Sequence, residues 1–475
     1  MNLTLAHFVS MGLTICIILG SGIYAARLVK SSSGFSLGGR SSSAKLVAGA
    51  IAGTSIGGGA TIGTAQLAFT VGLSAWWFTL GMGIGFLLLG IFFAKPLRRS
   101  ALETIPQYLV LNYGKGAGPI VSIISSAGTF FACVASVLPG ISLLSALLNI
   151  SPALSAFILM VLLAAYVYFG GMRGASISGL LKSVVIWITL FFAGGIAVLK
   201  LQALPSFSTT FSAPYWFSLF GIGTENALVC LSSLIVGVLC TQTYIQSLFS
   251  ATDAKTASIG AITAAAITIP VGLPSVAIAM FMHATHPETI PILVLPQFLI
   301  DYLPPAIGGI AIAGIFISII SSSAGMALGI GTMISKDIVA TVFKVKKDSL
   351  ILWSNRISIV GVAASVAIFS LINLQSQVLD WNYLSMALRG GGIFLPLILA
   401  IFKPHFLPPL WAIIAMISST LLAITAKPLF HFSTPPLFVG IYFSCILVIF
   451  GITIGKKYNY LLIHQLAKAK NHFHL

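Results

Sequence analysis

Two apolar stretches of the chain contain residues that are unusual in a plain helix but suited to binding a cation. The first, GTSIGGGATIG at residues 53–63, contains five glycines, each costing about 1 kcal/mol against alanine inside a helix. The second places three consecutive serines, Ser321 to Ser323, in the middle of an apolar run. A hard cation such as Na⁺ requires a cluster of oxygen atoms, which hydroxyl groups and carbonyls freed from helical bonding can supply without a carboxylate.

The glycine-rich stretch has two interpretations. Gly53 and Gly57, like Gly59 and Gly63, have the spacing of small residues that lets membrane helices approach closely. Alternatively, the glycines mark an unwound helix whose backbone lines a cavity and binds substrate and ion. The serine triplet favours the second interpretation, because its adjacent hydroxyls face two sides of a helix.

Two charged residues, Lys182 and Arg389, fall inside apolar runs, where a charge is costly and therefore usually functional. The alternative for each is a long side chain that extends to the membrane surface, and Arg389 could instead pair with Asp380. The eight acidic residues all fall in loops or near the ends of apolar runs. We therefore expect no carboxylate at the middle of the membrane.

The elements that position these residues are membrane helices. The chain has 475 residues, of which 58% are hydrophobic and 7% charged, and its mean hydropathy is +1.06. Apolar runs of roughly 20 residues, long enough to cross a bilayer, recur along nearly the whole length. These features predict an all-α polytopic membrane protein whose surroundings are the lipid bilayer. The five cysteines show no paired spacing and indicate no disulfide framework.

The net charge of +16 does not indicate nucleic acid as a partner, because the basic residues cluster in short gaps such as 95–100 and 344–349. Thirteen spans are predicted, and the positive-inside rule then places the N-terminus outside and the C-terminus in the cytosol, with Lys200 and Lys427 facing outward. The expected location is the cell membrane. The predicted spans are 6–28, 46–71, 74–94, 118–148, 153–170, 179–199, 225–249, 257–282, 306–333, 351–373, 383–402, 407–426 and 436–455.

Five segments, in order along nearly the whole chain, resemble motifs of the sodium/solute symporter family. They are GFSLGGRSSS (34–43), GTSIGGGATIGTAQLAFTVGLS (53–74), YFGGMRGASISG (168–179), QTYIQSLFSATDAKTA (242–257) and LPPAIGGIAIAGIFISIISSS (303–323). The resemblance implies one transporter domain with two inverted five-helix repeats, one helix before them and two after, and broken first and sixth core helices. The corresponding segments are a leading helix at 6–28, repeats at 46–199 and 225–402, two trailing helices at 407–455 and a basic cytosolic tail at 456–475.

The resemblance also implies a sodium site. Its carbonyl ligands would be Gly53, Ile56 and Ser318, and its hydroxyl ligands Ser321 and Ser322. A second sodium site of the family type lacks its residues here, because Gly179, Ala324 and Gly325 stand where an aspartate and further hydroxyls are expected. We expect Lys182, three residues after Gly179, to take part in coupling, as a fixed surrogate cation or as a proton carrier.

The substrate is expected between the two helix breaks. The residues predicted to bind it are Gly58, Gly59, Ala60, Thr241, Gln242, Thr243 and Arg389. For Gln242 the alternative is a polar contact between helices, and for Arg389 the functional interpretation is a clamp for an anionic group.

The sequence therefore predicts a symporter, without enzyme activity, that imports a small polar organic solute with Na⁺ by alternating access. A proton-coupled or uncoupled carrier of the same fold and a transporter-like sensor are the alternatives, and a channel is disfavoured because few polar residues line the spans. The sequence indicates neither the solute nor the oligomeric state.

Overall fold

The computed structural model describes residues 3–26, 31–430 and 434–472, and the side chains among them apart from those of residues 19, 21–26, 167–170, 427–430 and 455–472. The last two residues of the predicted first span, 27 and 28, and residues 473–475 of the predicted basic tail lie outside the described residues. The described chain is helical throughout, and its extended pairing is limited to one bridge between Ser42 and Ala251.

Each predicted span overlaps a helix. Within the described ranges, nine helices are long and apolar enough to cross a membrane, or ten if a bent pair counts as one, so the number thirteen is not confirmed. The helices that correspond to the predicted spans are α1 (Leu5–Ala26), α3 (Ala44–Ser55), α4 (Thr64–Val71), α5 (Trp77–Leu88), α6 (Ala94–Arg99), α8 (Ala117–Leu148), α9 (Pro152–Gln202), α11 (Thr224–Leu239), α12 (Gln242–Phe249), α13 (Ala254–Thr285), α15 (Pro305–Met333), α16 (Asp348–Ile372), α17 (Val378–Phe402), α18 (Pro409–Phe430) and α19 (Pro436–His472).

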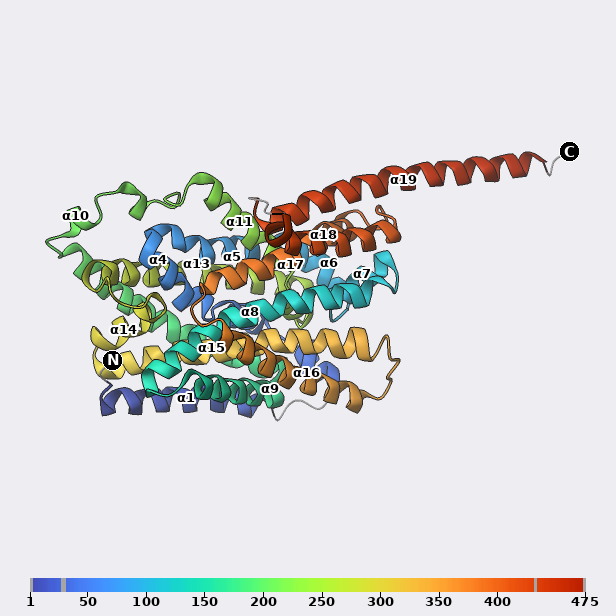
Figure 1. Ribbon diagram of the computed structural model, residues 1–475. Coiled ribbons are helices and arrows are strands. Elements are labelled where there is room, and N and C mark those ends of the chain that lie inside the picture. Colours follow the sequence, from blue (N-terminus) through green and yellow to red (C-terminus); the bar gives the residue numbers. More distant parts are fainter. Residues whose placement is uncertain (1–2, 27–30, 431–433, 473–475) are drawn as a thin grey trace.

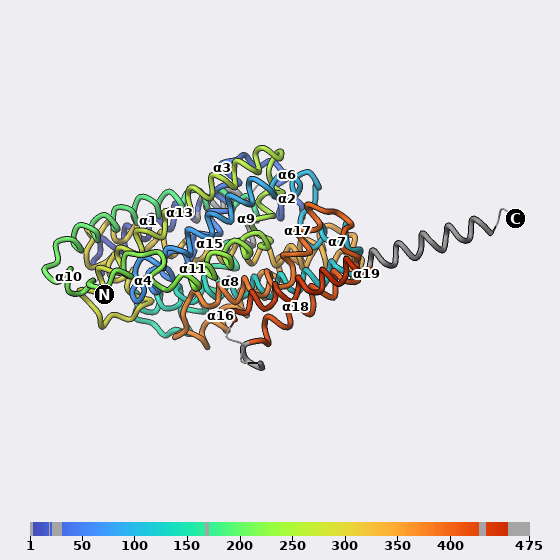
Figure 2. Tube along the Cα trace, turned by 90° about the horizontal axis from the view of Figure 1, so that it is seen from above, coloured from blue at the N-terminus to red at the C-terminus, as the bar shows by residue number. Residues whose placement is uncertain are grey.

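Helix α15 lies at the centre of the molecule. It packs against α1, α8, α9 and α16, and α9 and α15 lie side by side in both views (Figure 1, Figure 2). Every residue of α15 from Ala311 to Met333 is buried. This position explains its composition, because a helix surrounded by others needs small residues for close packing, and its serines must find partners inside the protein.

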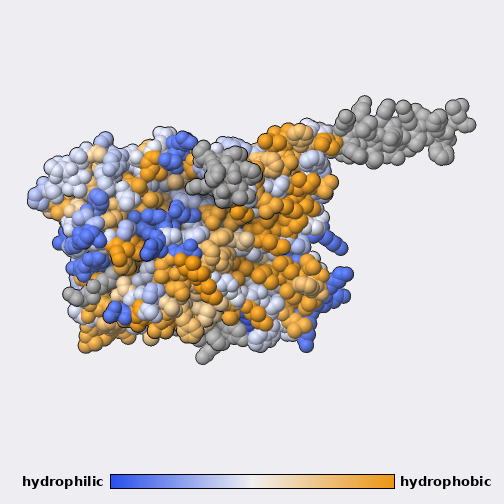
Figure 3. All heavy atoms as spheres, in the orientation of Figure 1, coloured by the Kyte–Doolittle hydropathy of each residue, from blue (hydrophilic) through white to orange (hydrophobic). Residues whose placement is uncertain are grey.

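The outer surface is apolar over a wide area. Figure 3 shows hydrophobic residues across much of this face, with hydrophilic residues gathered toward the ends of the helices. Exposed side chains such as Ile188, Ile357 and Ile449 contribute to this apolar surface. Such an area is far larger than a protein surrounded by water would expose, and it fits a lipid environment.

Two helices are broken where the sequence predicted. Helix α3 ends at Ser55, and Ile56 leaves the helical conformation with φ −83° and ψ 80°. The chain then enters a π-helical turn at Gly59–Gly63 before α4. Helices α11 and α12 form the second break, with a bend of 45° between them. Both breaks lie inside the protein, where their freed backbone groups must find partners.

Glycines hold α3 and α9 close together. A Cβ atom on Gly53 would lie 2.6 Å from Cα of Gly179, and one on Gly179 would lie 2.4 Å from the Gly49 carbonyl oxygen. Gly53 therefore serves helix packing, as in the first interpretation, and the helix break of the second interpretation follows it at Ile56. A further glycine, Gly171, has φ 50° and marks the kink within α9 that separates the two predicted spans.

Replacing Gly179 with alanine is expected to destabilise the protein by about 1–3 kcal/mol, because the added methyl group would push α9 away from the backbone of α3. Gly195→Ala is the matched control on the same helix, since a Cβ atom added there would meet nothing within 4 Å. The control should be neutral or slightly stabilising. Thermal unfolding of the purified variants measures both, and equal stability of the two would contradict the close contact of α3 and α9.

Candidate substrate pocket and cation site

The break after α3 exposes backbone carbonyl oxygens toward α15. The Ser322 hydroxyl donates a hydrogen bond to the Thr54 carbonyl, and the Ser318 hydroxyl donates one to the Ile56 carbonyl. Both serines are buried. Two of the residues predicted for the sodium site, Ile56 and Ser318, are thus in direct contact, and α15 supports the break through its hydroxyl groups.

Lys182 reaches the same place from α9. Its Nζ donates hydrogen bonds to the Ile56 carbonyl at 3.2 Å, to the Ser318 carbonyl at 3.1 Å and to the Ser318 hydroxyl at 3.3 Å. The residue is fully buried, with 0% of its surface exposed. The alternative in which this side chain extends to the membrane surface is therefore wrong.

The predicted sodium ligands do not fit a sodium ion while Lys182 is in this position. An ion that contacted the carbonyl oxygens of both Ile56 and Ser318 would compete with Nζ for the same two oxygen atoms. Of the other predicted ligands, Gly53 packs against Gly179, Ser321 is buried on α15, and the Ser322 hydroxyl bonds to Thr54. The oxygen atoms of Ile56 and Ser318 are suited to a cation, and in the structure they accept hydrogen bonds from the Lys182 ammonium group.

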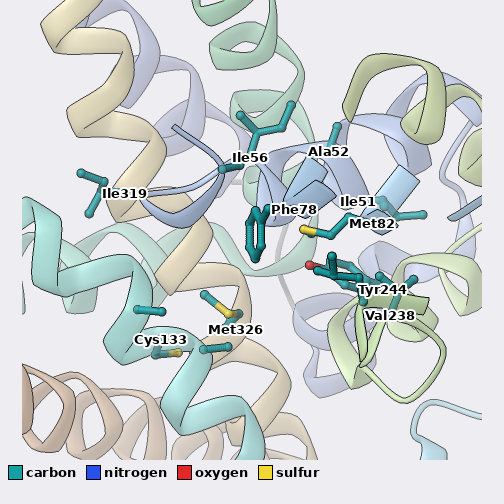
Figure 4. Packing of buried hydrophobic residues seen from close by; sticks show 14 of the residues in the cluster. Ile51, Ala52, Ile56, Phe78, Met82, Cys133, Val238, Tyr244, Ile319 and Met326 are labelled. Atoms are coloured by element: carbon teal, nitrogen blue, oxygen red, sulfur yellow. The ribbon is translucent and has the colours of Figure 1, made fainter. Parts of the chain in front are cut away.

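A pocket lies next to this site, between the two helix breaks. Four of the residues predicted to bind substrate line it, namely Gly59, Ala60, Thr241 and Arg389. The lining also includes residues that sequence reasoning missed, among them Ser136, Tyr244, Asn382, Phe78, Met82, Met326 and Met386. Figure 4 shows Phe78, Met82 and Tyr244 gathered near one another beside the break at Ile56.

One missed residue had a signal in the sequence. Ser136 continues a series of small polar residues on α8, Ser122, Ser125 and Thr129, whose spacing places them on one face of the helix. All four are buried. Asn382 and Tyr244 had no such signal, because they reach the pocket through the packing of α17 and α12 around the breaks.

Three predicted substrate residues lie outside the pocket lining. Gly58 packs against α8, where its Cβ would lie 2.5 Å from Cγ of Pro139. Thr243 lines a separate, smaller cavity with Thr54 and Gly325. Gln242 is fully buried; its Oε1 accepts from the Ile105 amide at 2.8 Å, and its Nε2 donates to the Glu103 carbonyl at 3.1 Å. Gln242 therefore joins the start of α12 to the loop before α7 (Ile105–Tyr113).

Arg389 places a guanidinium group at the pocket wall. Its side chain is 3% exposed and donates to the Ser385 carbonyl at 3.1 Å, to the Thr241 hydroxyl at 2.7 Å and to the Ser385 hydroxyl at 2.8 Å. In the described part of the chain, no carboxylate lies within ion-pair distance of Arg389. Neither extension to the surface nor pairing with Asp380 therefore accounts for its position.

Room for this arginine is provided by α8. A Cβ on Gly128 would lie 2.4 Å from Cγ of Arg389, so a larger residue there would displace the side chain. The Ser385 hydroxyl that accepts from Arg389 donates in turn to the Gly128 carbonyl. The guanidinium is thus held in one orientation by α8, α17 and the second helix break.

Comparison with known proteins identifies the family. Residues 35–407 match the sodium:solute symporter family. The chain belongs to that family. The relatives described next are named as transporters. The long apolar helices of the described chain are those of a multi-pass membrane protein.

The relatives are named as choline transporters, and a solved structure shows the fold. The chain is 25% identical over 371 residues to the high-affinity choline transporter 1 of Torpedo marmorata, covering 74% of this chain and 63% of that protein. It is 23% identical over 368 residues to the human high affinity choline transporter 1, covering 74% and 63%. The chain thus spans less than two thirds of the length of these relatives. A solved Na⁺-coupled sialic acid symporter, in a substrate-bound outward-open state, matches with a TM-score of 0.83 at 16% identity over 95% of this chain and 97% of that one.

Gln242→Ala is expected to lower the free energy of unfolding by about 1–3 kcal/mol, because it leaves the buried Ile105 amide and Glu103 carbonyl without their partner. Solute affinity should change little, since Gln242 does not line the pocket. Gln202→Ala, at the exposed end of α9, is the matched control and should leave stability unchanged. Loss of solute affinity without loss of stability would instead favour Gln242 as a substrate ligand.

Proposed function

We propose that the protein is a secondary-active carrier that imports a small polar organic solute bearing a carboxylate or similar anionic group, by alternating access. The observation that carries this proposal is Arg389, a buried guanidinium at the wall of the pocket whose partners are all neutral. A buried charge without a counter-charge is costly. A solute carboxylate would supply that counter-charge, and the planar guanidinium suits it.

The composition of the pocket supports an anionic rather than a cationic solute. None of its described lining residues is aspartate or glutamate. A quaternary ammonium such as choline would meet a like charge at Arg389 and no carboxylate to offset it. The names of the choline-transporting relatives therefore do not transfer directly to this chain.

The remaining lining suits the body of a small solute. Phe78, Met82 and Met386 provide apolar contacts, whereas Ser136 and Asn382 provide hydrogen-bonding groups. Because the pocket lies between two helix breaks, movement at the breaks can open it to one side of the membrane at a time. The proposed orientation in the cell membrane keeps the N-terminus outside and the C-terminus in the cytosol.

Two observations bear on the coupling ion. Family membership and the sodium-coupled solved relative support sodium. The position of Lys182 opposes sodium at the predicted site, because its ammonium contacts the carbonyl oxygens of Ile56 and Ser318. Uptake into sealed proteoliposomes with and without a sodium gradient separates these cases, and it also separates a carrier from a sensor that moves no solute.

Arg389→Gln is expected to weaken solute binding about tenfold to a hundredfold, because a hydrogen bond to a charged group contributes about 1.5–3 kcal/mol. Arg389→Lys should also weaken binding, since the point charge lacks the planar fork. The solute is found by thermal-shift screening of carboxylates, sugars, vitamins and quaternary amines, and its affinity is then measured by isothermal titration.

Arg99→Lys, an exposed position on α6, is the matched control and should bind normally. Full affinity in Arg389→Gln would contradict the role of this arginine. A wild-type protein that binds choline and no carboxylate would contradict the proposed solute class.

A further inference from the structure

We propose that the ammonium group of Lys182 replaces the sodium ion at the predicted cation site between α3 and α15, so that the carrier binds no sodium there. The part of this inference that concerns transport rests on the proposed function, whereas the part that concerns ion binding does not. Family membership implies a bound sodium ion, whereas the proposal places an ammonium group at the predicted site.

The Lys182 ammonium group makes three contacts at the site. Nζ lies 3.1–3.3 Å from three oxygen atoms, two of which are carbonyl oxygens of residues predicted to bind sodium. These are hydrogen-bond distances for an ammonium donor. Lys182 therefore links the break after α3 to the centre of α15, as a cation bound to the same oxygen atoms would do.

Close packing of α9 against α3 positions Lys182 at the site. The contact of Gly53 with Gly179 brings α9 against α3. Lys182 follows Gly179 by three residues, so it lies about one turn further along the same face of α9 and points at the end of α3. A larger residue at position 179 would meet the Gly49 carbonyl oxygen and move α9 outward. Gly179 and Lys182 are thus parts of one arrangement.

The described helices around the site bring no negative charge near Lys182. Helix α15 contains no titratable residue, and the acidic or basic residue that α3 contributes is the exposed Lys45 at its start. From α1 the buried titratable residue is His7, which is engaged with Thr4. Among the described residues, no carboxylate lies within ion-pair distance of Lys182. The site therefore holds one positive charge against neutral oxygens, as it would with sodium.

A tethered cation differs from sodium in that it cannot leave. Sodium that enters from one side and departs to the other couples its gradient to the solute. Lys182 is fixed to α9, so the site it fills cannot draw on a sodium gradient. Any ion gradient that drives this carrier must act at another position.

The test uses purified full-length protein and sodium chloride or potassium chloride at equal concentration. Any difference in the melting temperature of the wild type between the two salts should be the same in Ser321→Ala, because no sodium binds at the site between α3 and α15. Lys182→Ala should melt at a lower temperature in potassium chloride and regain part of the loss in sodium chloride, because the shorter side chain leaves room for an ion that stabilises the folded state. Lys182→Met should be destabilised in both salts alike, since it removes the charge but fills the volume.

Lys45→Ala, an exposed lysine on α3, is the matched control and should behave as the wild type. A sodium-specific rise in the melting temperature of the wild type that disappears in Ser321→Ala would overturn the proposal. If both Lys182 variants fail to fold, the comparison of wild type with Ser321→Ala still decides.

Transport distinguishes this inference from the proposed function. Once a solute is identified, any sodium dependence of its uptake by the wild type should be retained in Ser321→Ala, because sodium would then act at another position. Uptake that requires sodium and is lost in Ser321→Ala would refute the tethered cation while leaving the carrier function intact. Absence of uptake in both salts would count against the proposed function. The role of Lys182 would then be decided by the melting temperatures in the two salts.

Discussion

The arrangement of the binding region depends on one constraint, the need to satisfy the backbone carbonyls released where α3 ends. Inside a membrane protein no water from the bilayer is available for this task, and an unsatisfied carbonyl costs several kcal/mol. Here the Ser322 and Ser318 hydroxyls and the Lys182 ammonium supply the donors. The break can persist because α15 and α9 meet it from two sides, and the pocket exists because the break persists.

Close helix packing is the second requirement, since donors from two helices, α9 and α15, must converge on a few oxygen atoms at the end of α3. Gly49 and Gly53 of α3 have no side chains, so α9 packs directly against the backbone of α3. Gly57, in the break itself, lies so near Ser322 that a Cβ would be 2.5 Å from its hydroxyl oxygen. The glycines weaken the helix, but they also let α9 and α15 come close enough to donate hydrogen bonds to the released carbonyls. This accounts for the many glycines in the middle of a membrane segment.

Much of this could be predicted from the sequence. The glycine-rich stretch and the serine triplet indicated a broken helix beside a polar helix, and Lys182 and Arg389 stood out because charges are rare in such segments. What Lys182 does could not be predicted, because it depends on how near α9 comes to α3. A lysine near the end of a predicted span has two physically sound positions, at the surface or inside, and the contact of Gly53 with Gly179 decides between them. Gln242 shows the opposite case. Its polar side chain next to the second break suggested a substrate ligand, yet two of its hydrogen bonds connect to the start of α7 and the third to Gln246.

The two buried cations together constrain the energetics of transport. If Arg389 holds an anionic solute and Lys182 stays on α9, the charge that crosses the membrane is the charge of the solute and of any accompanying ion. Bringing one negative charge into a negative interior costs about 2.3 kcal/mol for each 100 mV of membrane potential. A fixed lysine cannot offset this work, because it does not move across the field with the solute. Accumulation of an anion beyond its electrochemical equilibrium by this chain therefore requires either a cation carried at a position other than the site between Ile56 and Ser318, or the exchange of one anion for another.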